Sequence, residues 1–458
     1  MADASGAMSR AVSAGRHFLT ATPARELLAS VGQTIDTIPP ARFPDKRWFQ
    51  RSFGRSMTDH PDDLLVGQGL FYLTEQRRLF LDCTAGHYQM TWGYDHPELR
   101  AVLLDGIERG IVWDNHSNIP SAPVKRLAAK LIELANQGEV SGLPADDDRL
   151  NTVLLGVVTG SVACAAALKI TLVHYATVKR EKGAPVFIAL DGNYHGTDLF
   201  AQRLRGMWPE YFTNVEIALV EPNDGEQLED TFRQYGERVA AFWAEPIMMN
   251  REVIVVEPQY LQLARSLCDQ AGALMALDEI QTGFWFPEVL YTRRCGVEPD
   301  FLVLGKGMTA GFHPLSALVY RGRTDRLEQY DAISTNGNAS LAAYLGLACI
   351  ALVEREAERI SQVGAHYHQR MCELAAEFPR LLAEARGAGH ISGLKFHQAE
   401  DALGFHRCAV ERGLWLRAHA YHAGHSTILT KLALPLDVEV ADFAVAAMRE
   451  LLLARPWQ

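Results

Sequence analysis

The sequence predicts an α/β protein built around a largely parallel sheet, and two observations support this fold class. From about residue 70 to about residue 330, short apolar runs alternate with segments of helical periodicity, which is the pattern of successive strands and helices. Several runs are almost continuously hydrophobic, as expected for strands that are covered on both faces. The runs that predict strands are Val153–Val158, Pro185–Leu190, Val215–Val220, Val239–Ala244, Ala273–Leu277, Phe301–Leu304 and Ser316–Tyr320.

The length of 458 residues exceeds a single typical core, so more than one domain is expected. We expect a large α/β domain over residues 71–335 and a smaller α+β domain over residues 336–458. The elements predicted in the smaller domain are helices at Leu341–Glu356, Val363–Phe378 and Leu403–Arg412 and strands at Ile391–Phe396 and Ile428–Leu434.

Residues 1–70 are expected to form an irregular arm, because the chain up to about Gly69 is rich in proline and lacks a clear period. Its first thirty residues are rich in Ala and Ser, poor in acids, and carry three arginines. A cleaved transit peptide has this composition, and so have a disordered tail and an amphipathic arm on a partner subunit. Since no clean apolar core stands beside a cleavage site, the sequence favours a tail or an arm.

Charge and cysteine content exclude several classes of function. The formal net charge is -11, with acidic and basic residues mixed along the chain, so we expect no nucleic-acid partner. We also expect no membrane span, because no apolar run is long enough. The seven cysteines are scattered and show no CxxC spacing, which favours reduced thiols and a cytoplasmic location.

Polar residues directly follow five of the predicted strands. Ligands of open parallel sheets bind beyond the carboxyl ends of the strands, so these residues are candidates for one shared site. They are Thr159-Gly160-Ser161, the segment Asp191–Gly196 with Tyr194 and His195, Glu245, the segment Asp278–Gly283, and Lys306.

Each of these residue types has a chemical use and a simpler alternative. Backbone N–H groups and a hydroxyl at Gly160-Ser161 suit a phosphate at a helix N-terminus, although small residues there are often simple caps. Asp278 suits a bond to a cationic ring nitrogen, or a structural ion pair. Lys306 stands between two glycines, and a desolvated lysine can attack an aldehyde; its alternative is a lysine that extends from a loop into solvent.

The most specific stretches are LDEIQTGF (Leu277–Phe284) and PDFLVLGKG (Pro299–Gly307), supported by TGSVACAAALK (Thr159–Lys169) and GNYHGT (Gly192–Thr197). In this order they resemble the motifs of the class III pyridoxal-phosphate aminotransferases, the group that contains ornithine, 4-aminobutyrate and other omega-amino transaminases. The resemblance runs from about Gly69 to about Leu436. It implies the pyridoxal-phosphate fold of type I, with a mostly parallel seven-stranded sheet and a smaller α+β domain.

The resemblance also assigns roles at the cofactor, pyridoxal 5'-phosphate. Lys306 would be the Schiff-base lysine and Asp278 the partner of the pyridine nitrogen. Gln281 would bond the phenolic oxygen, while Tyr194 and Ile280 would pack on the two ring faces. The remaining expected cofactor contacts are Gly160 and Ser161 at the phosphate, His195, and Glu245, which would help to orient Gln281 or gate a basic group.

The resemblance implies a homodimer in which a hydroxyl from the partner subunit caps the phosphate. Thr335 fits this role by its Ser-Thr context, and Ser334 fits by its distance from Asn338. We favour Thr335.

The chain departs from the family pattern at four places. The Glu and Asn usual after the phosphate-binding Ser are Val162 and Cys164. Met248–Arg251 replaces a glycine-rich run, and Trp285-Phe286 replaces Gly-Arg. Lys431 stands where an arginine often clamps a substrate carboxylate, and lysine offers only a point charge for that bond.

Ping-pong transamination between an amine or amino acid and an oxo acid is therefore the expected reaction, with racemisation, epimerisation or aminomutation on the same scaffold as the alternative. Tyr88, Trp92 and Trp285 are expected to line the substrate pocket together with Lys431, although such aromatic residues are often plain packing. His419, His422 and His425 are spaced three apart and suggest zinc, but their surroundings offer no other ligand, so we expect no metal.

Overall fold

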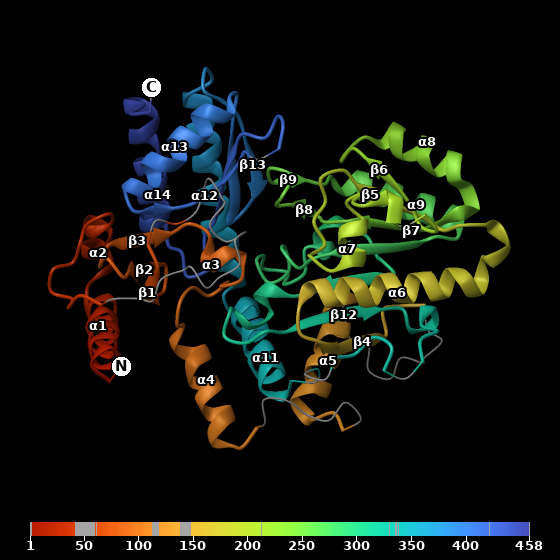
Figure 1. Ribbon diagram of the computed structural model, residues 1–458, viewed down its shortest axis with the longest axis horizontal. Coiled ribbons are helices and arrows are strands. Elements are labelled where there is room, and N and C mark those ends of the chain that lie inside the picture. Colours follow the sequence, from red (N-terminus) through yellow and green to blue (C-terminus); the bar gives the residue numbers. More distant parts are fainter. Residues whose placement is uncertain are drawn as a thin grey trace. The chain divides into compact units, whose positions relative to one another are not determined.

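The seven predicted strands form a single sheet in the computed structural model, in the order β4-β12-β11-β10-β7-β5-β6. β12 runs antiparallel to both of its neighbours, β11 and β4, whereas the remaining adjacent pairs are parallel. The predicted mostly parallel seven-stranded sheet is confirmed (Figure 1). The strands are β4 (Thr152–Val157), β5 (Val186–Leu190), β6 (Glu216–Val220), β7 (Val239–Ala244), β10 (Leu274–Asp278), β11 (Phe301–Leu304) and β12 (Ser316–Tyr320).

The structure describes residues 2–41, 60, 62–111, 119–137, 148–211, 213–328, 330–334, 337, 339–420 and 422–457.

Helices cover both faces of this sheet. On β7, Trp243 lies in the core cluster that also contains α6 (Gly160–Val178). The ring of its neighbour Phe242 lies 6.3 Å from Tyr260 of α9 (Pro258–Ala271). Because adjacent residues of a strand point to opposite faces, α6 and α9 pack on opposite sides of the sheet. This double cover explains why the strands are continuously apolar.

The helix α6 is, by length and composition, apolar enough to cross a membrane. From the sequence we expected no such segment. In the fold, Ala163, Ala167 and Ile170 of α6 are buried against the strands of the sheet. Its apolar character is therefore that of a core helix.

Two compact units make up the chain, one from Met1–Pro97 with Ser361–Gln458 and the other from Glu98–Ile360. These limits differ from the expected domains 71–335 and 336–458. Strand β3 (Leu79–Asp82) pairs with β15 (Leu414–Trp415), so the segment before Pro97 belongs with the C-terminal part. Helix α11 (Ser340–Arg355) packs on α5 (Ala122–Ala135), so it belongs with the large sheet. Strand pairing and helix packing between distant segments set these boundaries, and neither is visible in a local pattern.

The first unit contains two four-stranded sheets, in the orders β1-β2-β3-β15 and β13-β14-β17-β16. The predicted strand Ile391–Phe396 is β14 with the same limits, and Ile428–Leu434 corresponds to β17 (Thr427–Lys431). The other strands are β1 (Leu64–Gln68), β2 (Phe71–Thr74), β13 (Leu382–Ala388) and β16 (Arg417–His419), and the helices of the C-terminal part are α12 (Ala357–Glu377), α13 (Ala399–Glu411) and α14 (Val438–Ala454).

The expected irregular arm is wrong over most of its described length. Residues Ala2–Ala21 form helix α1, and Ala24–Ser30 form α2. The alanine-rich composition favours a helix, and Thr22-Pro23 interrupts it. α1 packs on β1 of its own unit, where Ala11 and Leu19 are buried.

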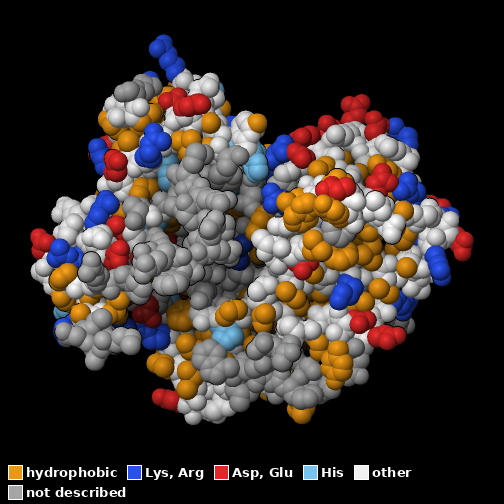
Figure 2. All heavy atoms as spheres, in the orientation of Figure 1, with side chains coloured by type: hydrophobic (Ala, Val, Ile, Leu, Met, Phe, Trp, Pro, Cys, Tyr) orange, Lys and Arg blue, Asp and Glu red, His pale blue; other side chains and the backbone are white. Residues whose placement is uncertain are grey.

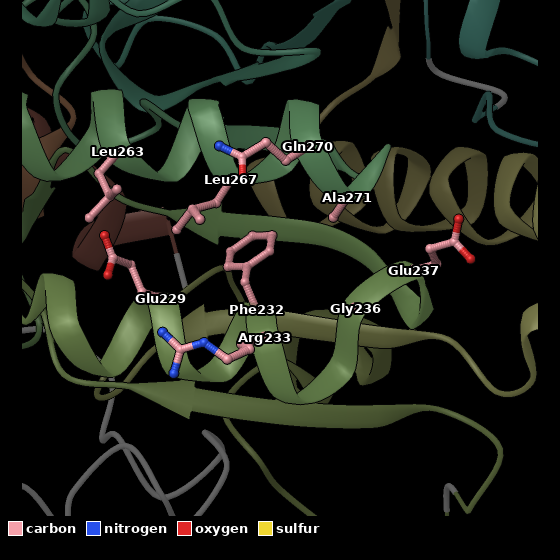
Figure 3. Close-up of a pocket in the computed structure, with 9 residues that line it drawn as sticks. All are labelled: Glu229, Phe232, Arg233, Gly236, Glu237, Leu263, Leu267, Gln270 and Ala271. Carbon is pink, nitrogen blue, oxygen red and sulfur yellow. The ribbon is translucent and has the colours of Figure 1, made fainter.

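A groove of about 460 Å³ lies between α8 (Gly225–Tyr235) and α9 on the large sheet (Figure 3). Phe232 and Leu267 form its apolar floor, and Glu229 and Arg233 stand at its side. None of the site residues expected from the sequence lines this groove. The candidate site therefore lies elsewhere on the sheet.

Candidate active site

The five expected strand ends meet at one edge of the large sheet. β5, β7, β10 and β11 are parallel to one another, and β4 runs in the same direction because both β4 and β11 are antiparallel to β12. The residues that follow these strands therefore gather beyond their carboxyl ends.

The turn after β4 leads into the capped N-terminus of helix α6. The side chain of Thr159 caps α6 by accepting a hydrogen bond from the Val162 N–H, and Ser161 Oγ accepts one from the Thr197 N–H at 3.0 Å. A Cβ on Gly160 would lie 2.4 Å from Cδ1 of Ile280, so a side chain at this position would collide with Ile280. The first turn of α6 thus combines a positive dipole end with a close approach to the backbone.

Asp278, at the end of β10, is buried and accepts hydrogen bonds from three donors. Nδ1 of His195 donates to its Oδ2 at 2.8 Å, and the Cys164 thiol donates to the same oxygen at 3.5 Å. The Ile280 N–H donates to Oδ1 at 2.9 Å. These three hydrogen bonds hold the carboxyl group of Asp278 in one orientation.

The ligand atoms of Cys164, His195 and Asp278 lie within 4.8 Å of one another. Among the described residues, these three form the group of potential ligands that could surround a metal ion. The spaced histidines His419 and His425 belong to no such group of described residues. The hydrogen bonds of Asp278 account for the clustering without an ion.

Lys306 follows β11 and opens the 3₁₀ turn η6 (Lys306–Thr309). Its φ of 39° lies in the left-handed region, which costs free energy in a residue other than glycine and is often found at functional sites. Burial lowers the pKa of the Lys306 ammonium, and the negative charges of Asp278 and Glu245 oppose that shift. Lys306 is therefore a buried amine close to the carboxyl groups of Asp278 and Glu245, and burial favours its neutral form.

Glu245, directly after β7, is also buried. Its Oε2 accepts a hydrogen bond from the Tyr194 N–H at 2.7 Å, and its Oε1 has no hydrogen-bond partner among the described residues. Burial raises the pKa of Glu245 to about 7. This carboxyl can therefore exchange a proton near neutral pH.

The expected ring-packing residues lie around this centre. Tyr194 is half-buried, and the guanidinium of Arg205 lies 5.5 Å from the centre of its ring. Ile280 and Gln281 are buried next to Asp278 in the sequence. Thr335, the expected phosphate cap from the partner subunit, lies outside the described residues.

The expected substrate residues divide between the two units. Trp285 is fully buried in the unit of the large sheet. Tyr88, Trp92 and Lys431 are buried in the other unit, where the Lys431 ammonium lies 5.6 Å from the centre of the Tyr88 ring.

The segment that carries Tyr88 is a left-handed turn, α3 (Ala85–Tyr88). All four of its residues have positive φ. Asp82 holds the start of the turn by accepting hydrogen bonds from the backbone N–H groups of Thr84 and Gly86. This strained conformation depends on those bonds.

Three residues near the expected groups were assigned no role from the sequence. Cys164 was noted only as a departure from the family pattern, although its position three residues after Ser161 on α6 placed it on the same helix face. Arg205, whose guanidinium lies near the Tyr194 ring, carried no motif signal. Asp82 was assigned no role, although its bonds to the Thr84 and Gly86 N–H groups are local.

Comparisons with known proteins show the family of the chain. The family described as Aminotransferase class-III matches residues 63–450. An acetylornithine aminotransferase of Synechocystis sp. is 27% identical over 427 residues, which cover 90% of this chain and 93% of that protein. A putrescine aminotransferase of Pectobacterium atrosepticum is 26% identical over 351 residues, covering 73% of this chain and 70% of that protein.

The fold is also shared with solved structures. An ornithine aminotransferase from Toxoplasma gondii has a TM-score of 0.76 at 24% identity, and the match covers 90% of this chain and 92% of that chain. With the family match over most of its length, the chain belongs to the class III aminotransferases and is an enzyme of amino transfer that depends on pyridoxal phosphate.

Proposed function

We propose that Lys306, Asp278 and Glu245 form the reactive centre of this aminotransferase. The proposal rests on the position of two buried residues at the carboxyl ends of adjacent strands. Lys306 follows β11, and Asp278, with its three hydrogen-bond donors, is the last residue of β10. Their charges also act on the pKa of Glu245, which Asp278 raises and Lys306 lowers. Three strands thus supply one amine and two carboxyl groups to one edge of the sheet.

The described residues fit pyridoxal phosphate. The first turn of α6, with Gly160 and Ser161, offers N–H groups and a hydroxyl to the phosphate. Asp278 offers a carboxylate to the ring nitrogen, and Lys306 offers an amine for covalent attachment. When bound, the cofactor supplies an electron-accepting ring that stabilises negative charge on the substrate carbon.

The protein residues then have separate tasks. Asp278 would accept a hydrogen bond from the ring nitrogen, and His195 and Cys164 hold its carboxyl group in place by donating to Oδ2. Lys306 Nζ accepts and returns the proton of the substrate carbon, since burial favours its neutral form. Glu245 orients the loop that carries Tyr194 through the backbone N–H of that residue.

We propose a primary amine at the end of an unbranched chain as the donor and an oxo acid as the acceptor. The named substrates of the relatives, acetylornithine, ornithine and putrescine, all carry such an amine.

We also propose a homodimer in the cytoplasm. Large apolar side chains are exposed on α7 (Leu199–Arg203) and in the segment after it, including Leu199, Phe200 and Tyr211. Figure 2 shows hydrophobic side chains gathered on the exposed face of the unit with the large sheet. Exposed apolar patches of this kind mark interaction surfaces. All seven cysteines are free thiols, which supports a reducing compartment. Sedimentation of the protein and of Phe200→Glu tests the dimer, and a wild-type monomer would contradict it.

The reactive lysine is tested by Lys306→Ala. We expect turnover to fall at least about 10⁴-fold, and borohydride to no longer fix the cofactor covalently to the protein. The matched control is Lys179→Ala. Lys179 is a half-buried lysine of the same unit whose burial also lowers its pKa, but its ammonium donates to the backbone carbonyls of Val239 and Ala271.

Lys179→Ala should lose stability and keep covalent fixation. If Lys306→Ala still turned over amine and still fixed the cofactor, the proposed role of Lys306 would be wrong. A screen of terminal diamines and amino acids against oxo acids, read from the visible absorbance of the bound cofactor, then identifies the substrates.

A further inference from the structure

Cys164 is a buried thiol that touches the carboxylate of the reactive centre. It lies on α6, three residues after Ser161, and its side chain is completely buried. Its sulfur lies 3.5 Å from Oδ2 of Asp278, the oxygen that also accepts the bond from His195. One helix therefore reaches both the phosphate end of the proposed site and the aspartate.

The thiol is a hydrogen-bond donor at this position. Burial and the charge of Asp278 raise the pKa of Cys164, so the sulfur keeps its proton at neutral pH. Because the carboxylate can only accept, the S–H group donates to Asp278 Oδ2. Two donors on Oδ2 and the Ile280 N–H on Oδ1 then fix the rotation of the carboxylate about its side-chain bond.

We propose that Cys164 is a positioning residue for the ring-nitrogen chemistry, acting through its hydrogen bond to Asp278 Oδ2. This inference rests on the proposed function, in which Asp278 meets the ring nitrogen. A carboxylate with an additional donor is a weaker base, so the shared proton stays on the ring nitrogen rather than on Asp278. Removing the donor moves that proton towards the carboxylate.

The alternative is that Cys164 is simply a small apolar side chain that fills the core. The two possibilities differ in which substitutions restore the wild-type behaviour. Cys164→Ser keeps a donor of similar size, whereas Cys164→Ala and Cys164→Val remove the donor, and Val keeps the space filled. A donor role requires Ser to match the wild type and both Ala and Val to differ from it.

The primary measurement is the ¹⁵N chemical shift of cofactor labelled at the ring nitrogen and bound to each variant. We expect wild type and Cys164→Ser to share one shift, and Cys164→Ala and Cys164→Val to move towards the value of an unprotonated pyridine. In the same two variants kcat should fall about 3- to 10-fold with KM for the amine unchanged, as expected for the loss of one hydrogen bond.

Cys268→Ala is the matched control. Cys268 is a fully buried thiol of α9 that donates to the Leu274 carbonyl, so its loss removes a buried thiol without touching Asp278. It should leave the ¹⁵N shift unchanged.

An unchanged shift in both Cys164→Ala and Cys164→Val would overturn the inference, and so would an equal change in Cys164→Ser and Cys164→Val. Neither result would touch the proposed function. That function fails separately if wild type and Lys306→Ala bind and turn over alike.

Discussion

Two buried glutamates beyond the ends of adjacent strands, Glu245 and Glu279, share one titration behaviour but differ in their partners. Burial raises the pKa of each to about 7. Glu279 accepts hydrogen bonds from the N–H groups of Tyr291 and Thr292, both at 2.6 Å. Glu245 accepts one from the Tyr194 N–H, and its other oxygen has no partner among the described residues.

The two carboxyl groups differ more clearly in where their partners lie along the chain than in their pKa. The donors to Glu279 come from the segment just after it, so this group closes a local loop around α10 (Thr292–Cys295). The charges that act on Glu245 belong to His195, Asp278 and Lys306, which follow three other strands. A raised pKa alone therefore does not mark a functional carboxyl, whereas a set of partners from several strands does.

Asp278 resembles Glu245 in that its partners, His195 and Cys164, come from other segments of the fold. We therefore expect Asp278 to act in the reaction. Asp278→Ala should lower turnover roughly 10²- to 10³-fold, since it removes a fixed charge from the reactive centre. Steady-state kinetics with saturating cofactor measure the loss.

The control is Asp300→Asn, which changes a buried aspartate bonded to Arg265 and to the Met275 N–H in the interior of the same unit. It should lose stability with kcat retained. Equal losses of kcat in the two variants would contradict a specific role of Asp278 in the reaction.

Glu279→Ala should lower the free energy of unfolding by about 2–4 kcal/mol, because two buried backbone N–H groups lose their acceptor. Urea titration of the apoprotein measures this, and kcat of the fraction that remains folded should stay close to wild type. A large fall in kcat with unchanged stability would instead place Glu279 in the reactive centre.

Glu245→Gln should reduce the pH dependence of stability. The pKa of Glu245 is raised above its usual 4.5 in the folded state, so its contribution is fully present below pH 4.5 and is lost as the pH rises through about 7. The loss amounts to about 3 kcal/mol at most.

Unfolding of the apoprotein at intervals from pH 5 to pH 8 tests this, with the variant losing less stability than wild type over that range. Glu279 keeps its own shift in the variant, so part of the slope should remain. Identical slopes would mean that Glu245 does not titrate in this window.

Gly160→Ala should weaken cofactor binding about 3- to 10-fold, the smallest effect, because the new methyl group meets the flexible end of Ile280. The double variant Gly160→Ala with Ile280→Val removes the nearest atom and should recover part of the affinity. Fluorescence titration of the apoprotein with pyridoxal phosphate measures both constants. A double variant weaker than the single one would contradict the steric explanation.

The sequence by itself determined the strands of the large sheet and the polar residues that stand at their carboxyl ends. Continuous apolar runs identified its strands, and the residues after them, from Gly160 to Lys306, could be expected at one edge because parallel strands end together. The motif around Asp278 and Lys306 was specific enough to indicate the family.

Tertiary structure decided everything that depends on contacts between distant segments. The pairing of β3 with β15 places the segment before Pro97 in one unit with the C-terminal part of the chain. The thiol of Cys164 met Asp278 only because α6 packs on the strand that ends there. Local periodicity records which face of an element is buried, and it carries no information about which distant side chain lies opposite.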